Sequence, residues 1–172
     1  MVFELFDRKG TKFTLDELAK SMRISKRTIY SEYSSKEDLL EAVVRSVFES
    51  IRRREAEILA NPELNILEKA KEVICIFPAQ KINFGRLDEL RVTYPRIYGL
   101  IHQEFEANWE HTFSILQRAV DEGYLKPVSF ENLRIILLGL FTELLSCDAS
   151  IQRVKLRECL DIILEGYICS PR

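Results

Sequence analysis

The sequence predicts an all-α protein, and three observations support that prediction. Strand patterns are nearly absent along the 172 residues, and apolar residues recur at the three-and-four spacing of helix faces. Ser, Thr, Pro and Gly stand where helices are expected to begin and end. The chain is long enough to bury a core, and 30% charged residues with a net charge of −2 are typical of a folded protein.

Three short helices are expected before residue 35. The first begins at the N-terminus and ends at Gly10, which follows two basic residues. The second begins after Thr14, because Thr14 and Glu17 have the spacing of a capping box. Ser25 caps the third, and Ile29 is expected to lie on its buried face. Two short helices separated by a brief turn form the outline of a helix-turn-helix, a motif that binds DNA.

The third helix is expected to present polar side chains to solvent. At 100° per residue, these side chains lie well away from the buried stripe of Ile29 and Tyr33. They are Arg27, Thr28, Tyr30 and Ser31. Residues 8 to 36 also contain eight Lys or Arg against three acidic residues, a net of +5. A charged run is usually only a solvated face, but here it coincides with the motif and favours DNA phosphates as the partner.

Residues of this region match a known family in order. The match consists of Glu4-Leu5-Phe6, Gly10, Thr14, Leu18-Ala19, Ile24-Ser25, Thr28-Ile29-Tyr30, Tyr33 and Ser35-Lys36-Glu37-Asp38-Leu39-Leu40. In these residues the chain resembles the DNA-binding region of the TetR family of transcriptional regulators. The resemblance implies that the third helix enters the major groove and that the fourth connects it to a helical body that binds ligands and forms dimers. It implies domains of residues 1–45 and 46–172.

Specific DNA contacts follow from the motif and the resemblance together. The resemblance implies that Tyr30 and Lys36 contact phosphates. Arg27 and Thr28 are expected to read bases, because both side chains point outward from the third helix. The full set of expected DNA-binding residues is Thr14, Ser25, Lys26, Arg27, Thr28, Tyr30, Ser31 and Lys36. The sequence departs from the family at the turn, where Arg23 stands in place of the usual Gly and Met22 in place of a small residue. A left-handed Arg23 is expected to cost about 1 kcal/mol.

The remaining chain predicts six further helices. Ser35 caps a long one that ends near Ala60, and Pro62 opens the next. The expected ranges are 36–60, 62–77, 86–92, 95–123, 130–146 and 155–169.

The penultimate helix is apolar almost all round, which indicates that one face needs a further partner. An internal core helix is the alternative. TetR-like bodies commonly pair through their last two helices, so the expected partner is a second copy of the chain. The expected interface residues are Leu133, Leu137, Leu140, Phe141, Leu144, Leu156, Leu160, Ile163 and Tyr167.

Aromatic residues cluster in the expected body, and core packing is their usual role. Some are expected instead to line a pocket for a small apolar or amphipathic effector, because Tyr, Trp and His add polar groups to an apolar cavity. The expected ligand-binding residues are Tyr94, Tyr98, His102, Phe105, Trp109 and Phe113. His102 and His111 lie 180° apart around one helix, so a shared metal is not expected.

Other function classes find little support. Two His, no Gly-rich phosphate loop and no recognisable nucleophile argue against an enzyme, and no cofactor is expected. The four Cys lack the paired spacing of a zinc site, so buried free thiols are expected, with a thiol sensor as the alternative. With no membrane-spanning run or signal peptide, a cytoplasmic protein is expected.

The sequence therefore predicts a transcriptional repressor that binds a palindromic DNA operator as a homodimer and is released by an effector. The alternative is a DNA-binding or protein-interaction module whose helical body only dimerises and binds no small molecule.

Overall fold

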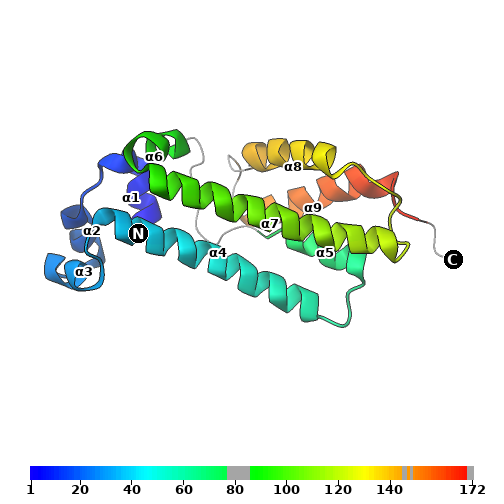
Figure 1. The fold of residues 1–172 in the computed structure, drawn as a ribbon, viewed down its shortest axis with the longest axis horizontal. Helices are drawn as coiled ribbons and strands as arrows, with labels where there is room; N and C mark the ends of the chain where they lie inside the picture. Colours follow the sequence, from blue (N-terminus) through cyan, green and yellow to red (C-terminus); the bar gives the residue numbers. More distant parts are fainter. Residues whose placement is uncertain (77–85, 145–146, 148, 170–172) are drawn as a thin grey trace. The chain divides into compact units, whose positions relative to one another are not determined.

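The computed structural model describes residues 1–76, 86–144, 147 and 149–169, and within them the prediction of an all-α fold is confirmed (Figure 1). The helices are α1 (Val2–Lys9), the 3-10 helix η1 (Gly10–Lys12), α2 (Leu15–Met22), α3 (Lys26–Glu32), α4 (Lys36–Ala60), α5 (Ile66–Ile74), α6 (Leu87–Thr93), α7 (Pro95–Asp121), α8 (Phe130–Leu144) and α9 (Ala149–Glu165). No strand occurs in these ranges, where an isolated backbone bridge joins Leu125 to Ile168.

Most predicted helix boundaries are confirmed because local side chains set them. Gly10 ends α1 with a left-handed φ of 58°. Ser129 precedes α8, and its hydroxyl accepts a hydrogen bond from the amide of Asn132 at 3.3 Å. Ser35 does the same for the amide of Asp38 at 3.0 Å at the start of α4.

Two predicted helices have wrong boundaries. The helix expected from Pro62 begins at Ile66, since the side chain of Asn65 caps it by accepting from the amide of Glu68 at 2.9 Å. That helix ends at Ile74, and its expected last residue, Phe77, lies outside the described residues. The last helix, expected at residues 155–169, begins at Ala149 and ends at Glu165, so it excludes Tyr167. The Tyr167 carbonyl instead accepts from the amide of Lys126 at 2.7 Å, which holds this segment in extended pairing.

The described chain forms two compact units. The first unit contains Met1–Ser50 and the described residues of 78–104, and it therefore includes α6 and the beginning of α7 as well as the N-terminal helices. The second unit contains the described residues of 51–77 and 105–172. Helices α4 and α7 each contribute to both units. The domains expected at 1–45 and 46–172 stay a prediction.

Each unit has its own apolar core. In the first unit, buried residues of α1 to α4 pack with Leu90 of α6 and Ile97 of α7, which are 4% and 1% exposed. In the second unit, the core joins α4, α5, α7, α8 and α9, with Leu137, Leu156 and Leu160 fully buried. Burial of this apolar surface is the main source of stability in each unit.

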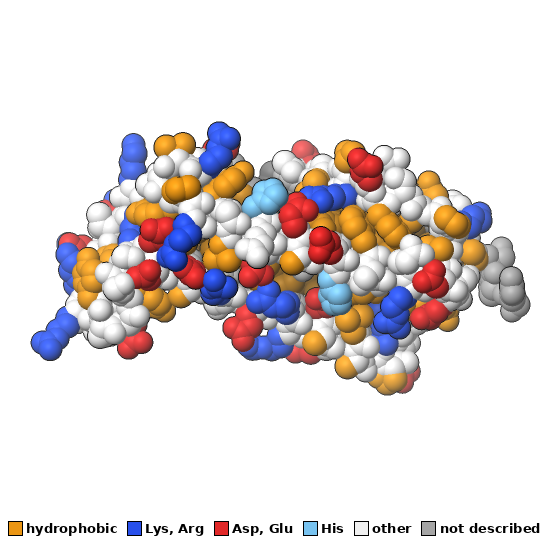
Figure 2. All heavy atoms as spheres, viewed as in Figure 1, with side chains coloured by type: hydrophobic (Ala, Val, Ile, Leu, Met, Phe, Trp, Pro, Cys, Tyr) orange, Lys and Arg blue, Asp and Glu red, His pale blue; other side chains and the backbone are white. Residues whose placement is uncertain are grey.

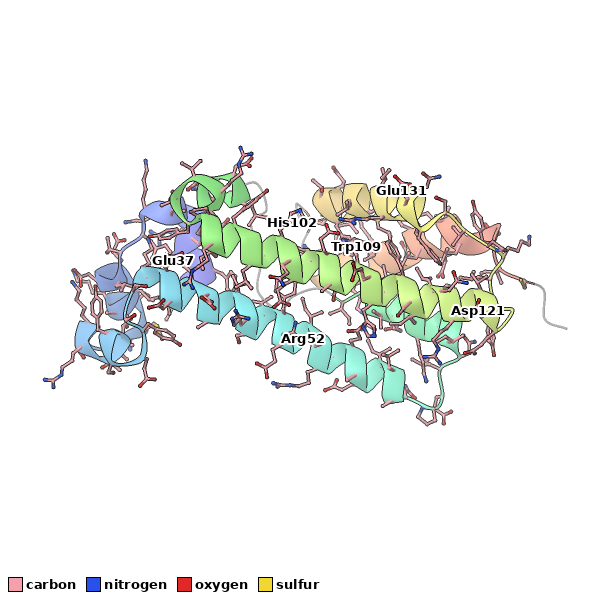
Figure 3. All side chains as sticks on the ribbon, in the orientation of Figure 1. Glu37, Arg52, His102, Trp109, Asp121 and Glu131 are labelled. Carbon is pink, nitrogen blue, oxygen red and sulfur yellow. The ribbon has the colours of Figure 1, made fainter. Side chains whose placement is uncertain are left out.

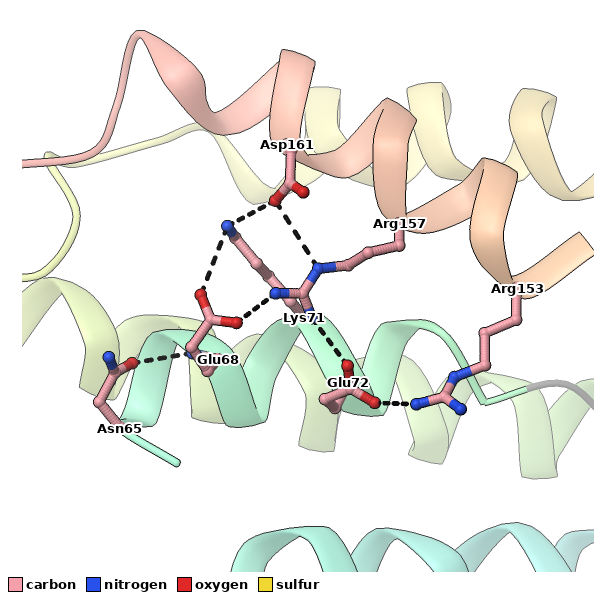
Figure 4. Close-up of polar contacts among 7 residues, drawn as sticks. All are labelled: Asn65, Glu68, Lys71, Glu72, Arg153, Arg157 and Asp161. Atoms are coloured by element: carbon pink, nitrogen blue, oxygen red, sulfur yellow. Dashed lines mark hydrogen bonds and ion pairs between the residues drawn. The ribbon is translucent and has the colours of Figure 1, made fainter. Parts of the chain in front are cut away.

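An ion-pair network joins α5 to α9 in the second unit (Figure 4). The buried ammonium of Lys71 lies 2.6 Å from Asp161 and 3.6 Å from Glu68. Arg157 donates to Glu72 at 2.8 Å and also pairs with Glu68. Arg153 pairs with Glu72. We call Glu68, Lys71, Glu72, Arg153, Arg157 and Asp161 the α5–α9 network. Its three acids and three bases balance, so the buried lysine is compensated.

Candidate nucleic-acid interface

The turn between α2 and α3 is fixed by backbone and side-chain hydrogen bonds. Thr14 and Glu17 form the predicted capping box, with distances of 3.2 and 3.0 Å between side chain and amide. At the other end of α2, Arg23 has the expected left-handed conformation, with φ 56° and ψ 36°. The amides of Arg23 and Ile24 bond to the carbonyls of Lys20 and Ala19 at 3.2 and 3.0 Å. This Schellman pattern satisfies the end of α2 and directs the chain into α3.

Helix α3 is held by one buried side chain and leaves its other faces open. Ile29 is 4% exposed, whereas Tyr30 is 47% exposed. Ser25 caps the helix and accepts from the amide of Thr28 at 3.0 Å. Arg27, Thr28 and Ser31 are exposed as expected. The sequence therefore forms a short helix with a capped N-terminus, and the polar residues of this helix face solvent.

Several of the expected DNA-binding side chains have partners within the motif. The hydroxyls of Ser25 and Thr28 lie 2.8 Å apart. Lys26 pairs with Asp16 at 2.8 Å, and this contact raises the pKa of Lys26. The ring of Tyr30 lies 5.9 Å from the same ammonium. Within the described ranges, Arg27 has no ion-pair partner, so its guanidinium is the cation of α3 that is most available to a base edge.

Lys36 is placed differently from the expected phosphate contact. Its ammonium donates to the carbonyl of Thr11 at 2.7 Å and to the carbonyl of Phe13. It also lies 3.9 Å from the centre of the Phe13 ring and 5.7 Å from that of Tyr94. Burial of the ammonium lowers the pKa of Lys36. In this structure Lys36 fastens the start of α4 to the segment between α1 and α2.

Contacts from α6 and α7 also hold the motif, and the sequence reasoning missed them. Glu89 accepts from the amide of Thr11 at 3.0 Å. Arg96 lies 3.2 Å from Glu37 and 2.9 Å from Glu41, which places one cation against the acidic first turns of α4. Gly10 was the available sequence signal, because its left-handed φ and lack of Cβ allow Glu89 to approach the chain. Nothing in the local pattern around Arg96 indicated its partners.

The expected ligand-binding residues are divided between the two units. Tyr94 and Tyr98 pack against the core of the first unit, and His102 is exposed on the part of α7 that belongs to that unit (Figure 3). Phe105, Trp109 and Phe113 belong to the second unit.

Trp109 belongs to an aromatic cluster in the second unit. The ring of Trp109 lies 5.5 Å from that of Phe113 and 6.2 Å from that of Phe141. Phe113 also stacks on Phe130 at 5.3 Å. Arg134 lies 5.9 Å from the Trp109 ring and makes a two-pronged contact with Glu106. The sequence placed Phe141 in the dimer interface and did not identify Phe130 or Arg134. This combination of core contacts and one ion pair fits both the core interpretation and the pocket interpretation of the aromatic residues.

Most of the expected dimer residues are buried in the chain's own core. These are Leu133, Leu137, Leu144, Leu156 and Leu160. Leu140, Phe141 and Ile163 are partly buried against the same core. The apolar surface left for a partner lies on other faces of α8 and α9, where Ile135 is 64% and Ile162 is 72% exposed. Helix α8 is apolar on both sides. The sequence analysis assigned one side to the dimer interface, but the chain's own core covers that side.

We call the exposed apolar residues of these two helices the α8–α9 face. Its members are Ile135, Ile136 and Leu138 of α8 and Ile151, Val154 and Ile162 of α9. Figure 2 shows how hydrophobic side chains are interspersed with charged ones on one side of the molecule. Large exposed aliphatic side chains on two packed helices are typical of an interface with another protein.

The described residues also bear on the other function classes. Cys75 is buried, and burial raises its pKa to about 11, so it is a poor thiolate. In the ranges that the structure covers, no group of three His, Cys, Asp or Glu could hold a metal ion. None of the described helices is long and apolar enough to cross a membrane.

Comparisons with known proteins agree with this architecture. Residues 3–43 match the family model of bacterial regulatory proteins of the tetR family. The chain is 30% identical over 129 residues to the uncharacterized HTH-type transcriptional regulator YvaF of Bacillus subtilis (strain 168), covering 74% of this chain and 68% of that protein.

Solved structures are similar to nearly the whole chain. The ketosteroid transcriptional regulator KstR2 of Mycobacterium tuberculosis superposes with a TM-score of 0.75 at 15% identity, covering 98% of this chain and 92% of that one. The TetR family regulator PfmR from Thermus thermophilus gives a TM-score of 0.70 at 16% identity, covering 95% and 94%. At these identities the likeness concerns the fold. With the matched motif and the YvaF relative, it shows that the chain belongs to the TetR family of bacterial transcriptional regulators.

Proposed function

We propose that this DNA-binding regulator is a repressor that binds a palindromic operator as a homodimer and is released by a small apolar or amphipathic effector. The observation that carries the proposal is the geometry of α3, a capped helix with Ile29 buried and Arg27, Thr28, Tyr30 and Ser31 exposed. A helix with this placement can enter the major groove with its N-terminal residues against base edges.

The proposed contacts divide between specificity and affinity. Arg27 is assigned to a base, where a guanidinium can donate two hydrogen bonds to guanine. Tyr30 is assigned to a phosphate. Thr28 is assigned to a base edge, which requires its hydroxyl to replace the hydrogen bond with Ser25 by one with the base. Lys36 remains a proposed phosphate contact. In that role its ammonium must give up a hydrogen bond to a backbone carbonyl and donate to a phosphate oxygen instead.

The homodimer part of the proposal rests on the α8–α9 face. Exposed Ile135 and Ile162 on adjacent helices form an apolar surface that a second copy can cover with the same residues, as two-fold symmetry requires. A dimer then presents two α3 helices to half-sites about one helical turn of DNA apart, roughly 34 Å.

The effector part rests on the aromatic cluster of the second unit. Trp109, Phe113, Phe130 and Phe141 supply apolar area, and the Arg134–Glu106 pair supplies polarity beside it. Effector binding there is proposed to alter the helices that continue from the second unit into the first, α4 and α7.

Selection of bound sequences from a random DNA pool tests the proposal directly. The enriched sequence should be palindromic, and Arg27→Ala should lose about 1–3 kcal/mol of discrimination at one base position in each half-site. Arg91→Ala removes an exposed cation of α6 and serves as the matched control, with unchanged sequence preference. No enriched sequence, or an Arg27→Ala variant that enriches the same sequence equally well, would contradict the assignment.

A further inference from the structure

Glu55 of α4 is a buried carboxylate in the second unit. The residue is 5% exposed, and its neighbours on α4 include Ile58, which belongs to the apolar core, and Leu59, which packs against that core. Among the described residues, no donor is in hydrogen-bond geometry with its Oε1 atom. Removing a carboxylate from water is strongly unfavourable unless a cation or a hydrogen-bond donor compensates it.

The neighbouring imidazole of His111 compensates Glu55 incompletely. Nδ1 of His111 on α7 lies 2.7 Å from Oε1, which is within ion-pair distance, but the N–H is not aligned for a hydrogen bond. The imidazole carries a charge only when it is protonated, and its side chain is 51% exposed. The next residue, Thr112, is buried, but its hydroxyl donates to the carbonyl of Asn108 at 2.9 Å.

Other buried polar side chains of this unit have partners. Lys71 contacts Asp161 and Glu68. The amide of Gln152 donates to the carbonyl of Leu144 at 3.1 Å. Among the buried polar side chains that the structure describes, Glu55 therefore has an oxygen atom, Oε1, that accepts no hydrogen bond. Buried charged groups that the fold does not satisfy are typical of binding sites.

We propose that Glu55 receives the head group of a protonated apolar amine, with His111 beside it. This rests on the proposed function, because it names the chemical class of the effector. An ammonium group donates a hydrogen bond to Oε1 and neutralises the carboxylate in one contact. An alcohol supplies the hydrogen bond but leaves the charge, and a carboxylate repels it.

The location of Glu55 connects the site to the DNA-binding motif through one helix. Glu55 and Lys36 both belong to α4, which begins four residues after the last residue of α3. Figure 3 labels Arg52, three residues before Glu55 on α4, and Trp109, two residues before His111 on α7. Trp109 is the only tryptophan of the chain, so its fluorescence reports on this part of α7.

Calorimetry of the full chain with three ligands of equal chain length tests the proposal. The probes are decylamine, decanol and decanoate. Decylamine should bind at least about tenfold more tightly than either other probe, as expected for a close pair of opposite charges. Glu55→Gln keeps the shape and an acceptor oxygen, and it should remove that preference. Glu57→Gln is the matched control, because Glu57 is exposed on the same helix and pairs with Arg54; it should keep the preference.

A second variant separates a ligand site from a structural pair. In His111→Ala the carboxylate loses its neighbouring imidazole and gains no donor in its place, so decylamine should raise the melting temperature more than it does in the wild type. If His111 is merely the structural partner of Glu55, the melting temperature falls and decylamine does not restore it, which overturns the assignment.

The remaining outcomes distinguish this inference from the proposed function. If decanol or decanoate binds as tightly as decylamine and releases DNA, the effector function stands and the Glu55 assignment is wrong. If decylamine binds through Glu55 while operator affinity stays constant, the site stands and effector release is wrong. Absence of decylamine binding to the wild type overturns the assignment irrespective of the DNA result.

Discussion

Arg23 occupies a backbone conformation that favours glycine, and this makes the turn of the motif a place where stability can be gained. Its φ of 56° brings the Cβ atom close to the backbone. Arg23→Gly should therefore stabilise the chain by about 1 kcal/mol. Urea denaturation of both proteins measures the difference.

Lys20→Gly is the matched control for that measurement. Lys20 is an exposed cation in the last turn of α2 with ordinary helical geometry, so glycine there should destabilise by about 1 kcal/mol. If Arg23→Gly destabilises as much as Lys20→Gly, the left-handed residue carries no strain and the interpretation is wrong.

Lys36 makes the second prediction at the residue scale. Lys36→Met keeps an apolar stem but removes the donor to the carbonyls of Thr11 and Phe13, so stability should fall by about 1–3 kcal/mol. Lys12→Met removes an exposed cation nearby and should change little. Equal stability of the two variants would exclude the fastening role.

The pH dependence of Lys36 has a definite sign. Burial lowers its pKa below the ordinary value of 10.5, so the folded chain binds fewer protons than the unfolded chain as the pH approaches that value. Wild-type stability should therefore rise relative to Lys36→Met as the pH increases toward 10.5. The proposed phosphate contact of Lys36 is tested separately by DNA binding. If Lys36 contacts a phosphate, Lys36→Met should reduce the slope of log affinity against log salt concentration by about one.

At the scale of elements, Gly10 determines how closely α6 can approach the end of α1. A Cβ on Gly10 would lie 1.8 Å from Oε2 of Glu89 and 2.6 Å from Nη1 of Arg86. Both atoms are engaged, because Glu89 accepts from the amide of Thr11 and from Arg86. Gly10→Ala should destabilise by more than about 1 kcal/mol, from backbone strain and the displaced hydrogen bonds together.

Gly99 provides the comparison for Gly10. It lies inside α7, and a Cβ there would have no neighbour within 4 Å. Gly99→Ala should stabilise by about 1 kcal/mol. Thermal unfolding of the two single variants measures both signs. A neutral Gly10→Ala variant would show that Glu89 can move without cost, which contradicts the close approach.

Sequence predicted these elements well wherever the information is local. The caps at Thr14, Ser25 and Ser129 each act within three residues, and the structure contains all three. The start of α5 was missed because Pro62 suits a first turn, but Asn65 supplies a side-chain cap that Pro62 lacks.

Contacts between distant segments were not predictable in the same way. Arg96 and Glu37 are 59 residues apart, and no spacing rule connects them. Periodicity also failed for α8, because Leu137 and Ile135 belong to different faces that are both apolar. Deciding which face meets the chain's own core requires the positions of α5, α7 and α9.

At the scale of the whole molecule, the exposed α8–α9 face leads to a prediction about assembly. Ile135→Asp should convert the proposed dimer to a monomer, because it places an unpaired carboxylate in an apolar interface. Sedimentation at micromolar concentration measures this change. The substitution lies on the surface of one chain, so helical content should not fall.

Val92→Asp is the control for assembly. Val92 is 82% exposed on α6, in the other unit, and its replacement should leave the dimer intact. A wild-type monomer, or an Ile135→Asp variant that remains dimeric and folded, would rule out this face as the interface.

The α5–α9 network also limits how this sequence can change over evolutionary time. Three acids and three bases share contacts, so loss of Lys71 leaves Asp161 and Glu68 with excess negative charge beside a buried position. A second substitution that removes an acid can relieve this excess, which makes the order of the two changes important. Relatives that lack a cation at position 71 should therefore also lack an acid at position 68 or 161. Among related sequences, substitutions at position 71 would then occur together with substitutions at position 68 or 161.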